Sequence, residues 1–427
     1  MRTADWLSID EALRVMLANV APTDSEQVPL DHACGRTLAE PIISPVDQPA
    51  RDNSAMDGYA AHAADVRGAT EAAPAILRVV EEVRAGGSPV RPVGHGEATR
   101  IMTGAPVPAG VDSVIRLEHT HDLGDGTIAV LTDGDAGRNV RQRGEDLQSG
   151  ESVFSAGRLL RPPDIGVLAM VGCTEPLVHR KPRVAVLATG DELVEAGNVA
   201  DIADGTRVVN SNTPALAAAL HAASCRPEPL GIARDDIADL RERLARALYS
   251  DALITTAGAS VGDHDLVKDA LEEMGCDTLF WRVKIRPGSP FSFGLVPRTG
   301  RPPLPVFGLP GNPVSVLVTF EVLVRPVLRR MQGRTALHPP TLIATAGDAM
   351  ASRPGLVRFL RVRLDRAGFD LPRAYLTGPQ GSGILTSVSS ADGLLVMPLE
   401  TAELPAGARA TVLSLSGSDD AQETHPY

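Results

Sequence analysis

Buried strands alternate with helices between Arg183 and Gln332, and this alternation constrains the fold more than any other feature of the chain. RVAVLATG (183–190), DALITTAG (251–258) and LPVFGLPGNP (304–313) are apolar runs typical of parallel strands that are covered on both faces. Helical patterns follow them in SNTPALAAALHAA, HDLVKDALEEMG and VSVLVTFEVLVRPVLRRMQ. We therefore predict an α/β domain with a doubly wound, mostly parallel sheet.

Shorter apolar segments separated by Gly and Pro surround this region and predict smaller modules. The chain contains 40 glycines and 34 prolines, so many turns and short strands are expected. The predicted division is an N-terminal and linker domain (1–44 and 146–180), a β-rich inserted module (45–145), the α/β domain (181–335), a C-terminal small β domain (336–415) and a polar tail (416–427).

Three local patterns give specific expectations inside these modules. Ser8 is placed to cap an amphipathic helix, because apolar residues recur after it at helical spacing. In RFLRVRLD the alternation places Arg361 and Arg363 on the face opposite the leucines. His119 and His121 fit an exposed strand pair better than a metal site.

Charge and cysteine content exclude several classes of protein. Lys and Arg total 41 against 53 Asp and Glu, and a net charge of −12 argues against a general nucleic-acid or anionic-membrane surface. The four cysteines form no CxxC pair, so neither a disulfide framework nor a cysteine zinc site fits. The N-terminus has the pattern of an amphipathic helix, and the most apolar run is too short to span a bilayer. We expect a cytoplasmic protein.

Three glycine-containing loops follow the predicted strands, in ATGDEL (188–193), TAGASVGDHD (256–265) and GLPGNPVS (308–315). In an open parallel sheet, ligands bind beyond the carboxyl ends of the strands, where helix N-termini favour anions. The same loops carry four carboxylates, Asp191, Glu192, Asp263 and Asp265. Carboxylates and phosphate carry like charges and repel each other, so their proximity is explained if Mg²⁺ lies between them, because Mg²⁺ prefers oxygen ligands and phosphate. The alternative is that each carboxylate only caps a helix.

The segment FWRVKIRPGSPFSFG (280–294) predicts a row of cations. At a spacing of two residues, Arg282, Lys284 and Arg286 point to one side of a strand. Such a row is a plausible cradle for a tetrahedral oxyanion in an otherwise acidic chain. A solvated strand face is the alternative.

Three upstream segments also look functional. PARDNSAMDGYA (49–60) has few large apolar residues, the segment from 101 to 118 places the Thr103 hydroxyl beside a Gly-Ala-Pro turn, and NVRQRGEDLQSGE (139–151) mixes arginines with acidic residues. Turn chemistry could account for each of them. No HExxH pattern is present, so a zinc protease has no support.

In this order, the motifs closely resemble the MoeA family of molybdopterin molybdenumtransferases, which are relatives of the gephyrin E domain. The resemblance runs from about Leu7 to Leu415 and rests on NSAMDGYA, MTGAPVP, RGED, ATGDEL, VGDHD, RPGSPFSFG and LPGNPVS. It implies that molybdate is inserted into adenylylated molybdopterin, with Mg²⁺ assistance and release of AMP. It also implies a homodimer of four-domain subunits, with active sites built from both chains.

The resemblance assigns roles to individual residues. It places Asp57 and Thr103 of the β-rich module, joined by Arg141 and Asp146, at the partner subunit's cleft. The cleft itself takes Glu192, Asp235 and Asp265 as carboxylates, Arg282 and Arg286 as cations, and Glu192 with Asp265 as the expected Mg²⁺ ligands. The residues expected to bind substrate are Thr189, Gly190, Asp191, Ser211, Asn212, Gly258, Ser260, Asp263, Lys284, Pro310, Gly311, Asn312 and Ser315.

Two departures from the family pattern are visible. Arg282 and Arg286 stand where many members have lysine, which keeps the charge but changes the donor geometry. The usual double glycine before the serine loop reads Ala257-Gly258-Ala259-Ser260.

Two other functions remain open from the sequence. If the chain were a molybdopterin adenylyltransferase, it would need only the α/β domain, and the other modules would have no purpose. A separate molybdopterin adenylyltransferase is also a candidate partner of this protein. A non-catalytic scaffold, as in gephyrin, would not need the acidic and cationic residues of the predicted cleft.

Overall fold

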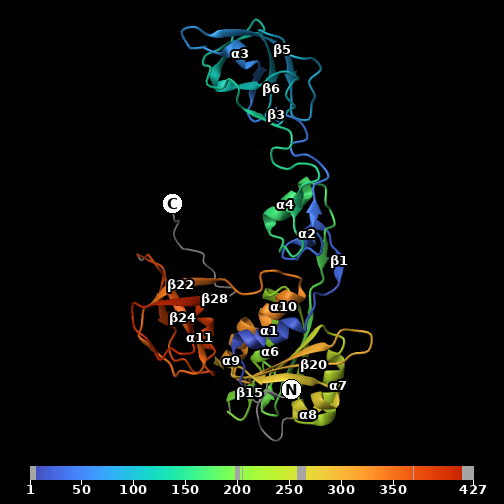
Figure 1. Cartoon of the computed structure of the whole chain (residues 1–427), viewed down its shortest axis with the longest axis vertical. Helices are drawn as coiled ribbons and strands as arrows, with labels where there is room; N and C mark the ends of the chain where they lie inside the picture. Colours follow the sequence, from blue (N-terminus) through green and yellow to red (C-terminus); the bar gives the residue numbers. More distant parts are fainter. Residues whose placement is uncertain (1–5, 198–201, 204, 257–265, 369, 416–427) are drawn as a thin grey trace. The chain divides into compact units, whose positions relative to one another are not determined.

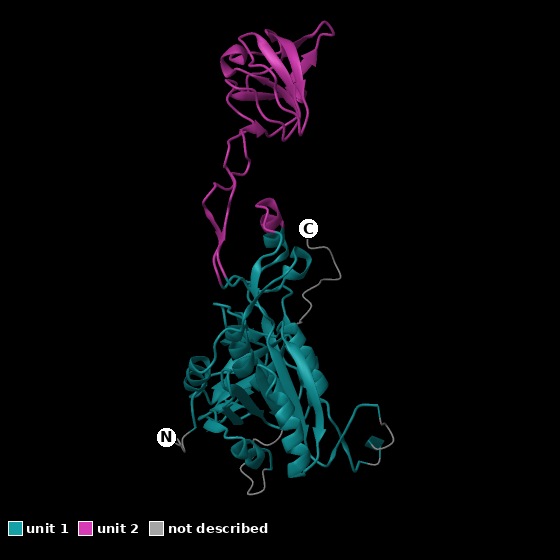
Figure 2. Cartoon of the chain, turned by 90° about the vertical axis from the view of Figure 1, so that its right-hand side faces the viewer, with its two compact units in different colours: residues 1–39, 157–165, 174–427 teal, residues 40–156, 166–173 magenta. Residues whose placement is uncertain are grey.

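The computed structural model describes residues 6–197, 202–203, 205–256, 266–368 and 370–415. The chain divides into two compact units (Figure 2). Unit 1 contains residues 1–39, 157–165 and 174–427, and unit 2 contains residues 40–156 and 166–173. No helix among the described residues is long and apolar enough to cross a membrane.

The α/β sheet of unit 1 is the predicted, mostly parallel sheet (Figure 1). Its described strands run in the order β16-β13-β17-β21-β20-β18. The first four are mutually parallel, and β20 is antiparallel to both of its neighbours, β21 and β18. Every residue of β13 after Arg183 is buried, as expected for a strand covered on both faces. The strands are β13 (Arg183–Thr189), β16 (Arg226–Ala233), β17 (Ala252–Thr256), β18 (Asp277–Arg282), β20 (Pro290–Val296) and β21 (Leu304–Leu309).

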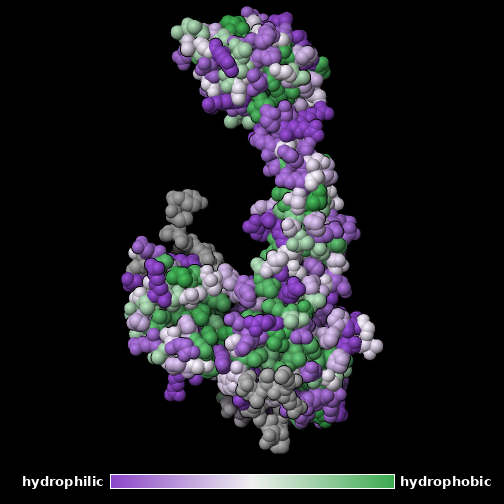
Figure 3. Space-filling model, in the orientation of Figure 1, coloured by the Kyte–Doolittle hydropathy of each residue, from purple (hydrophilic) through white to green (hydrophobic). Residues whose placement is uncertain are grey.

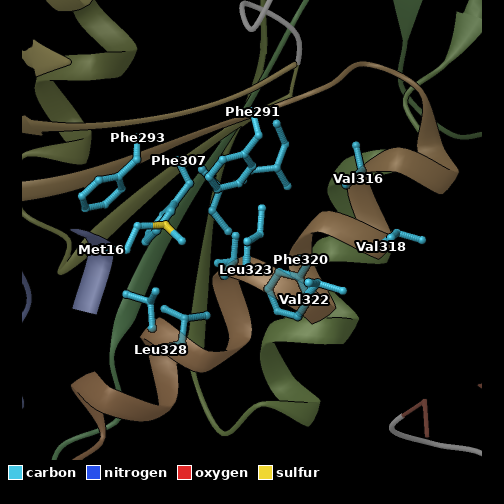
Figure 4. Close-up of a cluster of buried hydrophobic side chains, with 14 of the residues drawn as sticks. Met16, Phe291, Phe293, Phe307, Val316, Val318, Phe320, Val322, Leu323 and Leu328 are labelled. Carbon is cyan, nitrogen blue, oxygen red and sulfur yellow. The ribbon is translucent and has the colours of Figure 1, made fainter. Parts of the chain in front are cut away.

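Helices cover both faces of this sheet (Figure 1). One face packs on α7 and α8, and the other on α1, α6 and the continuous helical segment α9–η2–α10, in which η2 is a π-helical turn. On this second face Phe291, Phe293 and Phe307 meet Met16 and Leu328 (Figure 4). The helices are α1 (Ile9–Ala18), α6 (Asn212–Ala222), α7 (Ile237–Ala247), α8 (Leu266–Glu273), α9 (Pro313–Thr319), η2 (Phe320–Val324) and α10 (Arg325–Met331).

Side chains cap the first turns of two helices, and the cap at Ser8 is the predicted one. The Ser8 hydroxyl accepts a hydrogen bond from the Glu11 backbone N–H at 3.2 Å, and the Glu11 carboxylate accepts from the Ser8 N–H at 2.8 Å. This reciprocal pair satisfies two donors that the first turn of α1 would otherwise leave unpaired. At the start of α7 the Asp236 carboxylate accepts hydrogen bonds from the backbone N–H groups of Ala238 and Asp239.

The C-terminal part of unit 1 is a closed β domain. Strands β24, β25, β22, β28 and β26 are hydrogen-bonded in that order, and β26 pairs back to β24. The short strand β19 pairs in parallel with β24, so the segment after β18 joins the two sheets. The elements are β19 (Ile285–Arg286), β22 (Thr341–Ala346), β23 (Met350–Ala351), β24 (Val357–Asp365), β25 (Arg373–Leu376), α11 (Thr386–Ser389), β26 (Gly393–Met397), β27 (Glu403–Leu404) and β28 (Arg409–Ser414).

Arg361 and Arg363 lie on the face of β24 opposite Leu360 and Val362, as predicted, but only Arg363 is exposed. Arg361 is only 1% exposed, and its guanidinium donates to the Ser387 hydroxyl and the Gly381 carbonyl, both at 3.1 Å. Burial lowers the pKa of Arg361 to about 10. The segment around residues 380–387 covers this face of β24, and alternation along one strand does not reveal such a cover.

Unit 2 is built on a sheet whose described strands run in the order β7-β4-β6-β5-β9-β8. The expectation of an exposed pair at His119 and His121 was wrong for His119. His119 is half-buried, and its Nδ1 lies 2.7 Å from the Asp135 carboxylate. The elements of this unit are β2 (Ile42–Ile43), β3 (Asn53–Ser54), β4 (Gly58–Ala61), α3 (Ala63–Val66), β5 (Ala75–Val83), β6 (Glu97–Ile101), β7 (Ser113–Arg116), η1 (Leu117–His119), β8 (Thr120–Asp122), β9 (Thr127–Val130), β10 (Val140–Arg141) and β11 (Ser152–Phe154).

The remaining elements are short. Helix α4 begins at Pro162. The bounds are β1 (Ser25–Gln27), α2 (Leu30–Ala33), α4 (Pro162–Met170), β12 (Leu177–His179), β14 (Leu193–Val194) and β15 (Val208–Val209).

Candidate functional site

The predicted acidic loop after β13 meets the loop after β16 at the carboxyl edge of the α/β sheet. The Asp235 backbone N–H donates to the Asp191 carboxylate at 3.2 Å, so the loops after β13 and β16 are in contact. Asp191, Glu192 and Asp235 are all exposed there, which leaves their carboxylates accessible to a ligand. Gly190 has φ 137°, and a Cβ at this position would lie 2.5 Å from the Glu192 carboxylate. This turn therefore needs glycine.

The loops that precede α6 and α9 are joined at the same edge. The Asn212 side-chain amide donates to the Gly311 carbonyl at 2.8 Å. Among the described residues the Asn212 side-chain oxygen is buried and has no hydrogen-bond partner, which leaves one acceptor unsatisfied. Ser211 does not cap α6; the Asn210 side chain accepts from the Thr213 N–H instead, at 3.1 Å.

The other substrate-binding candidates of this edge divide by exposure. Thr189 at the end of β13, Pro310 directly after β21 and Ser315 in the first turn of α9 are buried. Gly311 and Asn312 are exposed directly before α9. The Val314 N–H in the first turn of α9 donates to the Ser382 carbonyl at 3.1 Å, so the C-terminal β domain reaches this edge.

The cationic segment alternates as predicted but does not form one strand. Val283 and Ile285 are buried, whereas Arg282 and Lys284 are half-buried and Arg286 is exposed. Strand β18 ends at Arg282, because the Lys284 N–H then donates to Leu7 at 2.8 Å and its carbonyl accepts from Val357 at 3.0 Å. The three cations therefore occupy a crossing between two sheets.

Two further observations complete the surroundings of this segment. The Arg282 guanidinium lies over the Trp6 ring, 5.4 Å from its centroid, in a cation–π contact. Arg358 on β24 is the register partner of Arg286 on β19. Burial, and secondly the charge of Arg286, lower the pKa of Arg358. The sequence analysis missed Arg358, because no local pattern shows that two segments about 70 residues apart will pair.

In unit 2 the structure brings Asp57 and Thr103 together. The Thr103 backbone N–H and hydroxyl donate to the same Asp57 carboxylate oxygen, at 2.7 and 2.8 Å. These two hydrogen bonds lower the pKa of Asp57, the backbone bond contributing most. Both residues are exposed, so the carboxylate is held ionised and in a fixed orientation on the surface.

Arg141 and Asp146 line a second feature of unit 2, a pocket of about 430 Å³. Arg141 lies on β10, which pairs with β3, and Asn53 of β3 also lines the pocket. The Asn53 side-chain oxygen is buried without a hydrogen-bond partner among the described residues. Figure 3 shows hydrophilic residues gathered around the position of β3. The pocket lining does not include Asp57 or Thr103.

Four predicted site residues, Gly258, Ser260, Asp263 and Asp265, lie outside the described residues. Among the residues that are described, no group of three or more His, Cys, Asp or Glu side chains could hold a metal ion. Glu192 nevertheless offers the oxygen chemistry that Mg²⁺ prefers. Mg²⁺ often takes only one or two protein carboxylates and completes its shell with water and substrate phosphates.

Three family models match the chain. The model for the "MoeA N-terminal region (domain I and II)" matches residues 7–172, the "Probable molybdopterin binding domain" matches 185–330, and the "MoeA C-terminal region (domain IV)" matches 344–415. A Mycobacterium tuberculosis protein named molybdopterin molybdenumtransferase 2 is 36% identical over 96% of this chain and 100% of its own length. The chain belongs to the MoeA family.

Other members of the MoeA family are similar over almost the same span. The molybdopterin molybdenumtransferase of a Nostoc species is 35% identical over 92% of this chain and 89% of its own. A crystal structure of a molybdopterin biosynthesis moeA protein from Pyrococcus horikoshii superposes with a TM-score of 0.83. That structure is 30% identical in sequence and covers 96% of this chain and 100% of its own. The MoeA fold therefore extends over nearly the whole chain.

Proposed function

We propose that this protein is a molybdopterin molybdenumtransferase. It inserts molybdate into adenylylated molybdopterin and releases AMP, as a step in molybdenum cofactor biosynthesis. The observation that carries the proposal is the match to molybdopterin molybdenumtransferases over 96% of the chain, which includes the β-rich and C-terminal modules. A molybdopterin adenylyltransferase is the weaker candidate, because that reaction would use only the α/β domain.

Binding of the pterin nucleotide is assigned to the carboxyl edge of the α/β sheet. The exposed Gly311–Asn312 turn before α9 and the loop after β13 present backbone groups there. The unsatisfied Asn212 oxygen supplies an acceptor next to them, where a small change in the loop would expose it to an N–H of the pterin. Ser260 and Asp263 are proposed to contribute from the loop after β17.

Mg²⁺ is assigned to Glu192 and Asp265. Bound at this edge, the ion would neutralise phosphate charge and polarise the pyrophosphate bond of the adenylylated pterin. Asp191 and Asp235, joined by a hydrogen bond, hold the neighbouring turn so that Glu192 stays at the rim.

Molybdate is assigned to the cations at the crossing between the sheets. Arg282, Lys284 and Arg286 present donors, and Arg282 is oriented by its contact with Trp6. Guanidinium groups bind tetrahedral oxyanions through paired N–H donors. Molybdate bound there would already be positioned relative to the bound pterin, so the reaction would not depend on a bimolecular encounter. No protein nucleophile is required.

The protein is further proposed to act as a cytoplasmic homodimer. In this arrangement Asp57, Thr103, Arg141 and Asp146 of one subunit complete the cleft of the other. The fixed Asp57 carboxylate and the pocket lined by Arg141 and Asp146 are features of a binding surface and support this assignment.

The test is to incubate purified protein with either ATP and molybdopterin or adenylylated molybdopterin, Mg²⁺ and molybdate. We expect AMP release from the second mixture and no consumption of ATP in the first. ATP consumption would identify an adenylyltransferase. A protein that dimerises but binds no pterin nucleotide would be a scaffold, and the proposed activity would be wrong.

A further inference from the structure

The edge of the α/β sheet where the parallel strands begin carries a second group of cations. Arg298 and Arg301 lie in the loop between β20 and β21, and Arg246 and Tyr249 lie at the end of α7. All four line a pocket of about 570 Å³. A second pocket of about 370 Å³ shares Tyr249, Arg298 and Arg301 with the first and extends to the first residues of β13. We call Arg246, Arg298, Arg301 and Tyr249 the edge cluster.

The Arg298 guanidinium is fixed in position. Its Nε donates to the Pro302 carbonyl at 2.7 Å, and one terminal nitrogen donates to the Leu248 and Ser250 carbonyls at 3.1 and 2.6 Å. Within the described part of the chain the other terminal nitrogen has no hydrogen-bond partner. An arginine carries five N–H donors, so two of them remain available on a group that is already held in place.

The positive charge at this edge is not neutralised. Burial, and secondly the nearby charge of Arg301, lower the pKa of Arg298. Among the described residues, the carboxylate that acts against this effect is Asp251, and Asp24 also lines the second pocket. Asp251 is already engaged, because it accepts two hydrogen bonds from Arg180 at 2.7 and 2.9 Å and one from the Arg183 N–H at 2.7 Å.

The segment that carries the two loop arginines is conformationally restricted. It reads PRTGRPP from Pro297 to Pro303, and each proline fixes one backbone torsion angle. Little conformational freedom would therefore be lost when a ligand binds between Arg298 and Arg301. Tyr249 is 67% exposed, so its hydroxyl can reach a ligand in either pocket.

From this geometry we propose that the edge cluster binds a phosphate-class oxyanion, either inorganic phosphate or a terminal phosphate group. The free donors of Arg298 and the exposed guanidinium of Arg301 match the geometry with which arginine binds phosphate. The site is distinct from the proposed active site, which lies where the same parallel strands end. It does not rest on the proposed function.

The proposal is tested by titrating the full-length protein with inorganic phosphate, at constant ionic strength adjusted with NaCl, by calorimetry or ³¹P NMR. We expect saturable binding that weakens at least about tenfold in Arg301→Gln, because a hydrogen bond to a charged group is lost. Arg241→Gln is the matched control. Arg241 is also exposed and lies on α7, but it is paired with Glu273, so its loss tests the effect of net charge alone.

Arg286→Gln separates this site from the proposed active site. If it binds phosphate like the unchanged protein while Arg301→Gln does not, the edge cluster is the site. Absence of saturable binding, equal weakening in Arg301→Gln and Arg241→Gln, or loss of binding only in Arg286→Gln would each overturn the proposal. Pyrophosphate titrated in the same way should bind more tightly, since it can span Arg298 and Arg301.

Discussion

Arg286 and Arg358 are register partners on parallel strands, where two like charges oppose the pairing of β19 with β24. The burial that lowers the pKa of Arg358 makes this repulsion harder for water to screen. An anion bound beside both guanidinium groups would remove the repulsion. The two arginines are therefore the residues at which the proposed molybdate site is tested most directly.

Replacing Arg286 with alanine should raise the molybdate concentration needed for half-maximal activity by about tenfold or more, because charge-assisted hydrogen bonds to the oxyanion are lost. Binding of the pterin nucleotide should change much less. Steady-state kinetics with varied molybdate and a separate nucleotide-binding titration measure the two effects. Arg363→Ala, an exposed arginine on β24, is the control, and an unchanged molybdate dependence in Arg286→Ala would contradict the assignment.

Asp57 gives a prediction about pH. Its pKa is lowered in the folded protein, so its ionised form stabilises the fold above the ordinary value of about 4, and this contribution is lost as the pH falls through the folded-state pKa. Thr103→Val removes the hydroxyl bond and keeps the backbone bond, so the pKa of Asp57 should rise part of the way towards its ordinary value. Carboxyl NMR titration measures this shift.

Asp125 is the internal control for that titration. The hydroxyl and the backbone N–H of Thr127 both donate to Asp125 and lower its pKa, as those of Thr103 do for Asp57. Thr103→Val leaves these bonds to Asp125 in place. A shift at Asp125 equal to that at Asp57 would mean that the substitution disturbs the unit as a whole. No shift at Asp57 would mean that the Thr103 hydroxyl does not hold the carboxylate.

At the scale of elements, α1 depends on the reciprocal pair between Ser8 and Glu11. Ser8→Ala should lower the free energy of unfolding of unit 1 by about 1 kcal/mol, the usual effect of losing an N-cap. Urea denaturation followed by circular dichroism measures it. Ser25→Ala, at an exposed position on β1, should have almost no effect. Equal effects of the two substitutions would show that the cap contributes little.

Elements whose signal is local could be predicted from the sequence. The runs that form β13, β17 and β21 are apolar over several residues, and Ser8 and Asp236 supply caps that need only their own turn. The crossing after Arg282 could not be predicted, because it depends on partners in two distant segments. The burial of Arg361 could not be predicted for the same reason, since its cover comes from residues about 20 positions further along the chain.

In the candidate site, too, local motifs could be predicted from the sequence, whereas contacts between distant segments could not. The residues named from motifs at the carboxyl edge do come together where they are described, as Asp191 does with Asp235 and Asn212 with Gly311. Contacts that depend on strand pairing, such as that of Arg286 with Arg358, appear only in the folded chain. Spacing along one segment predicts which residues share an edge, but not which other segment completes it.

For the whole molecule, the proposal that both subunits form each active site can be tested by mixing variants. Asp57→Asn and Arg286→Ala should each be weakly active alone. A heterodimer of the two contains one site with both residues intact, so it should regain up to about half of the unmodified activity per dimer. Tagged co-expression and purification of the heterodimer provide the sample. No recovery would place both residues in the same subunit's site.

The central claim is that carboxylates at the sheet edge, together with Mg²⁺, promote release of AMP from adenylylated molybdopterin when molybdate is present. Its most direct test is an anaerobic time course of AMP in the unmodified protein, Glu192→Gln and Asp265→Asn, with circular dichroism to verify folding. The account predicts molybdate-dependent AMP release that requires Mg²⁺ and is lost in both folded variants. Undiminished AMP release by folded Asp265→Asn and Glu192→Gln would contradict it.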